Sequence, residues 1–215
     1  MKCSTKIIFY LFILVFGLNT FSLLSQTKES NTSLKTLKDL YKLNQIDSVV
    51  SLTKNTIKYL KSTDSKDSLF IAKLYIYEFM GLHKTKKSLQ NIASIDTGIT
   101  YCPKTKAGDS LKAVFYNKKA YLENELSLTS KSYKSILKSL NLLENLPNPS
   151  AGSLMGAYLL LSNQNAYYGN FEKAKYYMRL AEDIYDKNKT EIDNNTWELN
   201  GNHHRLGVIA KYRKI

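Results

Sequence analysis

Glycine and proline are scarce in this chain of 215 residues, which holds nine Gly and three Pro. So few breakers argue against a loop-rich β-sandwich and against collagen-like or proline-rich segments. A glycine-rich phosphate-binding loop is absent as well. Hydrophobic residues make up 43% of the chain and charged residues 23%, which is the balance of a folded domain rather than of an acidic disordered chain. This composition favours helices.

Acidic residues are missing from the first 25 residues, where Lys2 and Lys6 precede the uncharged apolar run Ile7–Leu18. A short basic start, about a dozen apolar residues and a small residue near Ser25 are typical of a cleaved export signal. We therefore expect the protein to be exported and to be periplasmic or envelope-associated. The alternative is an uncleaved anchor in the inner membrane over residues 7–24, because a spanning helix needs about 20 apolar residues.

Cysteine is almost absent, since the chain holds only Cys3 and Cys102. Cleavage of the signal removes Cys3, so the exported protein has no internal disulfide and is stabilised by apolar packing. Cys102 lies beside Pro103 with no neighbouring His, Asn or second Cys to activate it. We predict a partly buried loop cysteine rather than a reactive or intermolecular thiol.

Basic residues outnumber acidic ones, and the net charge of +13 falls to +11 when the signal is removed. Such an excess can indicate nucleic-acid binding, but export and the lack of a recognition motif argue against that partner. The lysines are spread along the chain, as on solvated helix faces. A sharper alternative is contact with an anionic membrane surface or an acidic partner segment through Lys84, Lys86 and Lys87, or through Lys104 and Lys106.

Apolar stretches recur along the rest of the chain at steps of about 35 to 45 residues, which is typical of a repeat architecture. One series begins at Asp67-Ser68-Leu69 and again 42 residues later at Asp109-Ser110-Leu111, with each Asp as a predicted N-cap. The five helix starts predicted in this series are residues 33, 68, 110, 153 and 195.

A second series of helices alternates with the first. Its anchor residues are followed by apolar residues at +3 and usually +4, which places them on one helix face. These anchors are Ile46, Leu89, Tyr133 and Phe171. We predict linkers at Asp96–Gly108 and at Leu146–Ser150, where the prolines and glycines gather.

Helical hairpins repeated about every 40 residues indicate an α-solenoid, because one pair cannot bury its apolar face alone. In Gly169-Asn170-Phe171-Glu172-Lys173-Ala174, the Gly forms a tight turn, and Phe171 and Ala174 are expected to let the second helix pack closely on the first. Ala181 supplies a second small residue seven positions later. This stretch resembles the tetratricopeptide repeat (TPR) family, although Ser162 and Asn165 replace that family's usual Gly and aromatic residue.

The resemblance implies an all-α fold, an α-solenoid of about four TPR-like pairs plus a terminal helix over about 195–212. The predicted organisation is a signal peptide over 1–25, a linker over 26–32 and a repeat domain over 33–215. The family's first helices line a concave groove that takes a protein or peptide. Polar and aromatic residues on these helices are therefore our groove candidates, although packing between repeats would explain several of them equally well. They are Asn117, Lys118, Tyr121, Asn124, Asn163, Tyr167 and His204.

Catalytic motifs are missing from the sequence. His203 and His204 are adjacent, so on a helix they point about 100° apart and cannot chelate one metal in the usual way. We predict a non-catalytic protein with no cofactor and no metal site. Its predicted function is an exported scaffold that binds a protein or peptide. The alternative is the ligand-sensing N-terminal region of a longer signalling protein of the histidine kinase or transcriptional regulator type.

Overall fold

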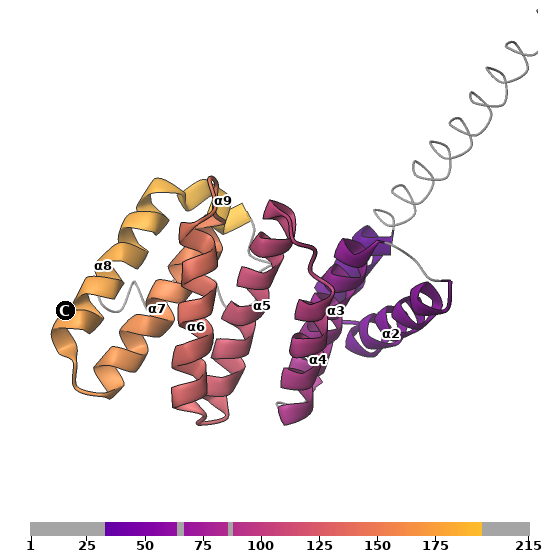
Figure 1. Ribbon diagram of the computed structural model, residues 1–215, viewed down its shortest axis with the longest axis horizontal. Helices are drawn as coiled ribbons and strands as arrows, with labels where there is room; N and C mark the ends of the chain where they lie inside the picture. The colour runs from indigo at the N-terminus through magenta and orange to yellow at the C-terminus, as the bar shows by residue number, and fades with distance from the viewer. Residues whose placement is uncertain (1–32, 64–66, 86–87, 195–215) are drawn as a thin grey trace, which may run out of the picture. The chain divides into compact units, whose positions relative to one another are not determined.

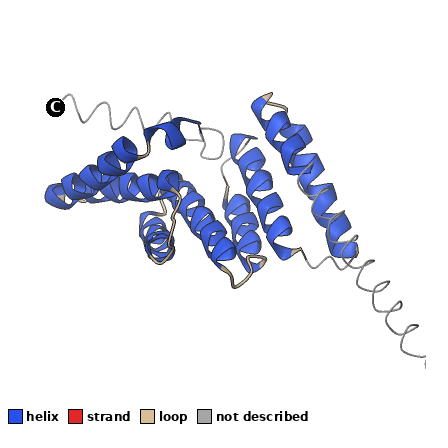
Figure 2. Ribbon diagram, turned by 90° about the horizontal axis from the view of Figure 1, so that it is seen from above, coloured by secondary structure: helices blue, strands red, loops and turns tan. Residues whose placement is uncertain are grey.

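The computed structural model describes residues 33–63, 67–85 and 88–194 of the chain. Over these residues it consists of helices joined by short loops, without a strand (Figures 1 and 2). None of these described helices is long and apolar enough to cross a membrane. The predicted signal segment over 1–25, the linker over 26–32 and the final helix from residue 195 lie outside the described residues.

The chain divides into two compact units, Met1–Gln45 and Ile46–Ile215. In the first unit the structure describes a helix over residues 33–42. The second unit contains, in chain order, α2 (Ile46–Ser62), α3 (Ser68–Thr85), α4 (Leu89–Thr100), α5 (Lys106–Glu125), α6 (Thr129–Glu144), α7 (Ala151–Tyr167), α8 (Phe171–Lys187) and the short α9 (Lys189–Asn194).

Consecutive helices of the second unit pack as pairs: α3 with α4, α5 with α6 and α7 with α8 (Figure 1). The pairs are joined through α4 against α5 and α6 against α7. The first helices of successive pairs also touch, because α5 contacts both α3 and α7. The all-helical class predicted from the sequence is therefore confirmed for the described residues, and the packing of adjacent helices, which includes α2 against α3, is consistent with a helical repeat.

The turn between paired helices has the same backbone geometry more than once. Ser127, between α5 and α6, and Gly169, between α7 and α8, both have positive φ, at 59° and 77°. In each turn this residue donates its N–H to the carbonyl three residues back, and the next residue donates to the carbonyl five residues back. This pattern is a Schellman motif. Asn44 repeats it at the end of the 33–42 helix, and the turn predicted at Gly169 is confirmed.

Small residues bring the paired helices close together. Between α5 and α6, Ser132 Oγ donates to the Ala120 carbonyl at 2.7 Å and Ser139 Oγ donates to the Ala113 carbonyl at 2.8 Å. All four residues are buried. A serine hydroxyl can reach a main-chain oxygen of the neighbouring helix only where no larger side chain separates the two backbones.

The pair α7–α8 uses the same contact, with Ser162 Oγ donating to the Ala174 carbonyl at 2.8 Å. Ser162 replaces the Gly that is usual in the TPR family, and its hydroxyl stabilises the contact between α7 and α8. Phe171, in contrast, is 63% exposed, so the prediction that it packs α8 onto α7 is wrong. It is the first residue of α8, and the buried face of that helix begins at Ala174.

α7 is the most enclosed element of the second unit. Its sequence contains no charged residue, and most of its side chains are buried. A helix that is apolar around its whole circumference requires neighbours on all sides. One cluster joins α7 to α5 and α6, with Ala120, Ile136, Leu143 and Leu160 at its centre. A second cluster joins α7 to α8 and α9 through Met155, Met178 and Ile192.

The linker predicted over Asp96–Gly108 is largely wrong, because α4 continues to Thr100 and α5 begins at Lys106. Gly98 lies inside α4 rather than breaking it. A Cβ at this position would lie 2.4 Å from the Phe115 ring of α5 and 2.8 Å from Cβ of Tyr75 on α3. A close contact between helices therefore explains Gly98. The second predicted linker, Leu146–Ser150, is confirmed as a loop.

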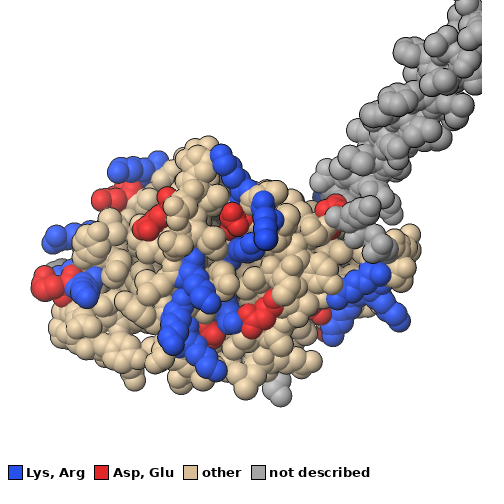
Figure 3. All heavy atoms as spheres, viewed as in Figure 1, with Lys and Arg blue, Asp and Glu red and all other residues tan. Residues whose placement is uncertain are grey.

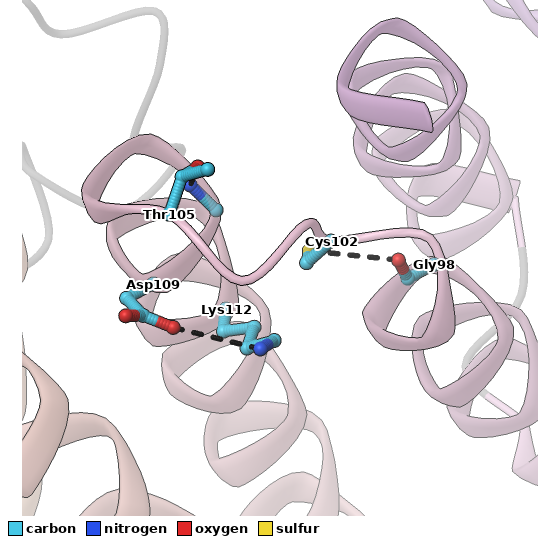
Figure 4. Close-up of polar contacts among 6 residues, drawn as sticks. Gly98, Cys102, Thr105, Asp109 and Lys112 are labelled. Carbon is cyan, nitrogen blue, oxygen red and sulfur yellow. Dashed lines mark hydrogen bonds and ion pairs between the residues drawn. The ribbon is translucent and has the colours of Figure 1, made fainter. Parts of the chain in front are cut away.

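The predicted N-caps have mixed outcomes. Asp67 caps α3 as expected, since its Oδ1 accepts from the Phe70 N–H at 2.9 Å. The prediction for Asp109 is wrong, because Thr105 caps α5 one turn earlier and accepts from the Gly108 N–H at 3.1 Å (Figure 4). A Cβ on Gly108 would overlap the Pro103 carbonyl oxygen, so this glycine allows the chain to turn sharply into α5.

Replacing Ser127 with Gly should raise the free energy of unfolding by about 0.5–1 kcal/mol. The left-handed conformation costs a non-glycine residue about 1–2 kcal/mol, and the greater unfolded-state entropy of Gly offsets part of that gain. Urea unfolding followed by circular dichroism measures the change. The control Ser130→Gly, inside the first turn of α6, should lower stability instead; a loss at both positions would contradict the strain at Ser127.

Replacing Ala174 with Leu should destabilise the protein by about 1–3 kcal/mol, because the added methylenes overpack the α7–α8 contact. The same measurement applies. The matched control is Lys175→Leu, which adds the same side chain to an exposed position of α8 and should change stability by less than about 0.5 kcal/mol. Equal effects at the two positions would mean that α7 and α8 are not closely packed at Ala174.

Candidate functional site

A pocket of about 370 Å³ lies where α6 and α8 begin and α7 ends, and we call it the turn pocket. Its size falls in the lower part of the range of small-ligand sites. Two lysines and no acidic residue take part in its lining, which consists of Thr129, Ser130, Tyr133, Lys134, Gln164, Asn165, Tyr168, Asn170 and Lys173.

Two helix N-termini meet at the turn pocket. The residues that precede α6 and α8, Leu128 and Asn170, form no side-chain capping hydrogen bond. The first turn of a helix has N–H groups without intrahelical partners and carries a partial positive charge. Lys134 and Lys173 add two full charges, and both side chains are exposed. The pocket is therefore electropositive.

Gln164 is the most buried side chain in the pocket lining, at 2% exposure. Its Nε2 donates to Ser132 Oγ. The single hydroxyl hydrogen of Ser132 is donated to the Ala120 carbonyl. The group facing Ser132 must therefore be a donor, which determines the orientation of the Gln164 amide. Its Oε1 is buried without a hydrogen-bond partner, so a ligand that supplies a donor would remove a desolvation penalty.

Five exposed aromatic side chains come from α6, the end of α7, the turn that follows it and α8, and two of them, Tyr133 and Tyr168, line the turn pocket. We call these five the aromatic surface: Tyr133, Tyr167, Tyr168, Phe171 and Tyr176. Tyr167 is 80% exposed and meets Tyr168 edge to face, with ring centroids 5.3 Å apart. The surface over the α7–α8 turn is mostly free of charged side chains in Figure 3, where Lys and Arg are elsewhere interspersed with Asp and Glu.

Half-buried tyrosines support the aromatic surface from below. Tyr176 packs edge to face on Tyr177 at 5.4 Å, and Tyr177 stacks on Tyr158 of α7 at 6.3 Å. Burial raises the pKa of both Tyr177 and Tyr158 above the ordinary value of a tyrosine. Both phenols are therefore neutral and serve as packing surface between α7 and α8.

Two of the predicted groove residues lie inside the packing between helices. Asn117 is 3% exposed, and its Nδ2 donates to the Ser153 carbonyl at 2.8 Å. Tyr121 donates its hydroxyl to the Gly156 carbonyl at 3.0 Å. These bonds tie α5 to α7, the first helices of successive pairs, which is the packing role that the sequence left open for such residues.

The other groove candidates are not brought together. Asn124 and Asn163 are exposed on α5 and α7, and Lys118 is partly exposed. Tyr167 belongs to the aromatic surface, while His204 lies outside the described residues. The sequence reasoning overlooked Gln164, Tyr168 and Lys173, because they come from a helix end, a turn and the next helix, and only the hairpin brings them together.

Two further pockets of the second unit differ from the turn pocket because each contains a buried glutamate. Between α2 and α3, a pocket of about 270 Å³ includes Glu78, whose carboxylate accepts from Ser94 Oγ at 2.8 Å. Between α4, α5 and α6, Glu123 accepts from Ser135 Oγ at 2.7 Å. Lysines line both pockets and would attract an anion. In each pocket, however, the glutamate carboxylate would repel that anion and counteract the attraction.

Cys102 is a buried loop thiol, as predicted. It is 7% exposed, and its Sγ lies 3.6 Å from the Gly98 carbonyl oxygen (Figure 4). Burial raises the pKa of the Cys102 thiol to about 11, which outweighs the opposing effect of Lys112. Within the described part of the chain, no group of His, Cys, Asp and Glu side chains could hold a metal ion.

The sequence matches no known protein-family model and no curated protein. The resemblance to the TPR family therefore rests on the residues and helix order described above.

Cys102 should react slowly with iodoacetamide at pH 8 in the native protein, and the rate should rise only as the pH approaches 11, because only the thiolate attacks. The raised pKa stabilises the fold while the thiol is protonated, and this contribution is lost as the pH rises from about 9 through 11. Alkylation in a Cys3→Ser background, with and without urea, measures the rate. Fast labelling of native protein at pH 8 would contradict the burial of Cys102.

Proposed function

We propose that this protein is an exported, non-catalytic, TPR-like helical scaffold that binds a protein or peptide partner. The N-terminal sequence pattern supports export to the periplasm or envelope. The paired helices, the contacts between first helices and the repeated Schellman turn support a TPR-like repeat. The observation that carries the proposal is the aromatic surface around the turn pocket.

Five large aromatic side chains remain exposed on this surface although burial would stabilise them. A contiguous exposed apolar patch on a protein surface commonly marks an interaction site. Tyrosine is favoured at such sites because it supplies a large contact area and a hydroxyl at a low cost in side-chain entropy. A partner that covers Tyr167, Tyr168 and Phe171 would bury these rings.

The proposed binding surface differs in position from the groove that the resemblance implies. It lies on α6, on the end of α7, on the turn that follows and on α8. Asn117 and Tyr121 on the first helix α5 are already engaged by α7. We therefore place the main partner contact at the aromatic surface and treat Asn124 and Asn163 as a separate test of the groove.

Crosslinking and pulldown from the native envelope, with the full chain carrying a C-terminal tag, should recover a specific protein or peptide. The double variant Tyr168→Ala/Phe171→Ala should weaken that binding about 30- to 1,000-fold, because each lost aromatic contact costs about 1–2 kcal/mol and every 1.4 kcal/mol is about tenfold.

The matched control is Tyr59→Ala, which removes a tyrosine that is 64% exposed on α2 and should leave binding unchanged. The variant Asn124→Ala/Asn163→Ala tests the groove face. Equal binding by the Tyr168→Ala/Phe171→Ala variant and the wild type would place the contact elsewhere, and loss only in the Asn variant would assign it to the groove.

A further inference from the structure

We infer that the turn pocket receives an acidic side chain of a bound peptide, an Asp or Glu whose main-chain N–H is accepted by Gln164 Oε1. This inference rests on the proposed peptide-binding function and adds the chemical class of the partner segment. It is carried by the charge of the pocket, by the buried acceptor of Gln164 and by the aromatic residues on either side.

The charge of the turn pocket favours a carboxylate. Lys134 and Lys173 come from different helices and form no ion pair with another described residue. The first turn of α6 adds unpaired N–H groups with no acidic residue in that turn, whereas Glu172 in the first turn of α8 offsets part of the positive charge of that helix end. No Asp or Glu lines the pocket, so nothing within the lining neutralises this positive charge, whereas the α2–α3 pocket contains Glu78.

Gln164 favours a peptide over a free anion. Its Oε1 is an acceptor, and its orientation is set by the chain from Gln164 Nε2 to Ser132 Oγ to the Ala120 carbonyl. A free carboxylate ion offers only acceptors at neutral pH and cannot satisfy it. A peptide offers an N–H at every residue except proline, so a segment with an acidic side chain supplies both the donor and the anion.

The aromatic residues favour an extended segment rather than an isolated side chain. Tyr133 from α6 and Tyr168 from the α7–α8 turn both line the pocket, and both rings are also exposed outside it. They can contact the methylenes of an acidic side chain inside the pocket and the peptide planes on either side. The adjoining Tyr167 and Phe171 would extend that contact along the peptide.

The test is a titration of the full chain with acetyl-tetraglutamate amide and, as its neutral counterpart, acetyl-tetraglutamine amide. We expect the acidic peptide to bind at least about tenfold more tightly, with an affinity that falls as salt is raised. The variant Lys134→Gln/Lys173→Gln should reduce this affinity about tenfold. The control Lys54→Gln/Lys58→Gln changes the charge equally at the pocket that contains Glu78 and should have little effect.

Nuclear magnetic resonance of the Gln164 side-chain amide tests the hydrogen bond separately. The acidic peptide should shift this resonance, whereas acetate, which has no donor at neutral pH, should not. Gln164→Met, which removes the acceptor and keeps the length, should weaken peptide binding. Should that variant fail to fold, the exposed Lys134 and Lys173 still provide the test.

Three results would overturn the inference: equal affinity for the two peptides, equal loss in both lysine variants, or the same Gln164 shift with acetate. The last result would indicate a site for small anions only. These failures are distinguishable from failure of the proposed function. A partner recovered by pulldown and lost in Tyr168→Ala/Phe171→Ala would keep the scaffold while excluding the acidic segment.

Discussion

The close approach of paired helices is the constraint on which the rest of the second unit depends. Buried Ser and Ala residues at the α5–α6 and α7–α8 contacts leave so little side-chain volume between the helices that Ser132, Ser139 and Ser162 donate directly to main-chain oxygens of the opposite helix. Each such bond satisfies a hydroxyl that would otherwise be buried at a cost. It also aligns the helices in register, so that the turn of each pair falls at the same end.

The turn pocket follows from that alignment. Because α6 and α8 begin at the same end of their pairs, their N-termini converge beside the end of α7. The Schellman turn at Gly169 then directs Tyr168 and Asn170 toward α6. The buried Ser132 has a second consequence, since it orients Gln164 and leaves Oε1 without a partner. Packing and the proposed binding site therefore share a residue, because the Ser132 hydroxyl contacts both Ala120 and Gln164.

Glycine illustrates how one residue type serves different purposes in this fold. Gly169 provides the positive φ of a turn and has nothing within 4 Å of a built Cβ, so its role is conformational. Gly98 and Gly108 have ordinary backbone angles but no room for a side chain. From the sequence alone, Gly98 and Gly108 look like part of a linker, because the residues that occupy the space around them are distant in the chain.

The helical class and the positions of most helix starts follow from the amino-acid sequence, because the spacing of apolar residues and the turn residues are local properties. It also predicted the buried thiol of Cys102 from its neighbours. Which side chains are buried and which are exposed depends on the tertiary structure. Asn117 and Tyr121 became contacts between α5 and α7, while Phe171, predicted to pack, became exposed. Exposure depends on the neighbouring helix and its distance, and Gln164, Tyr133 and Lys173 form a site only because two hairpins place their ends together.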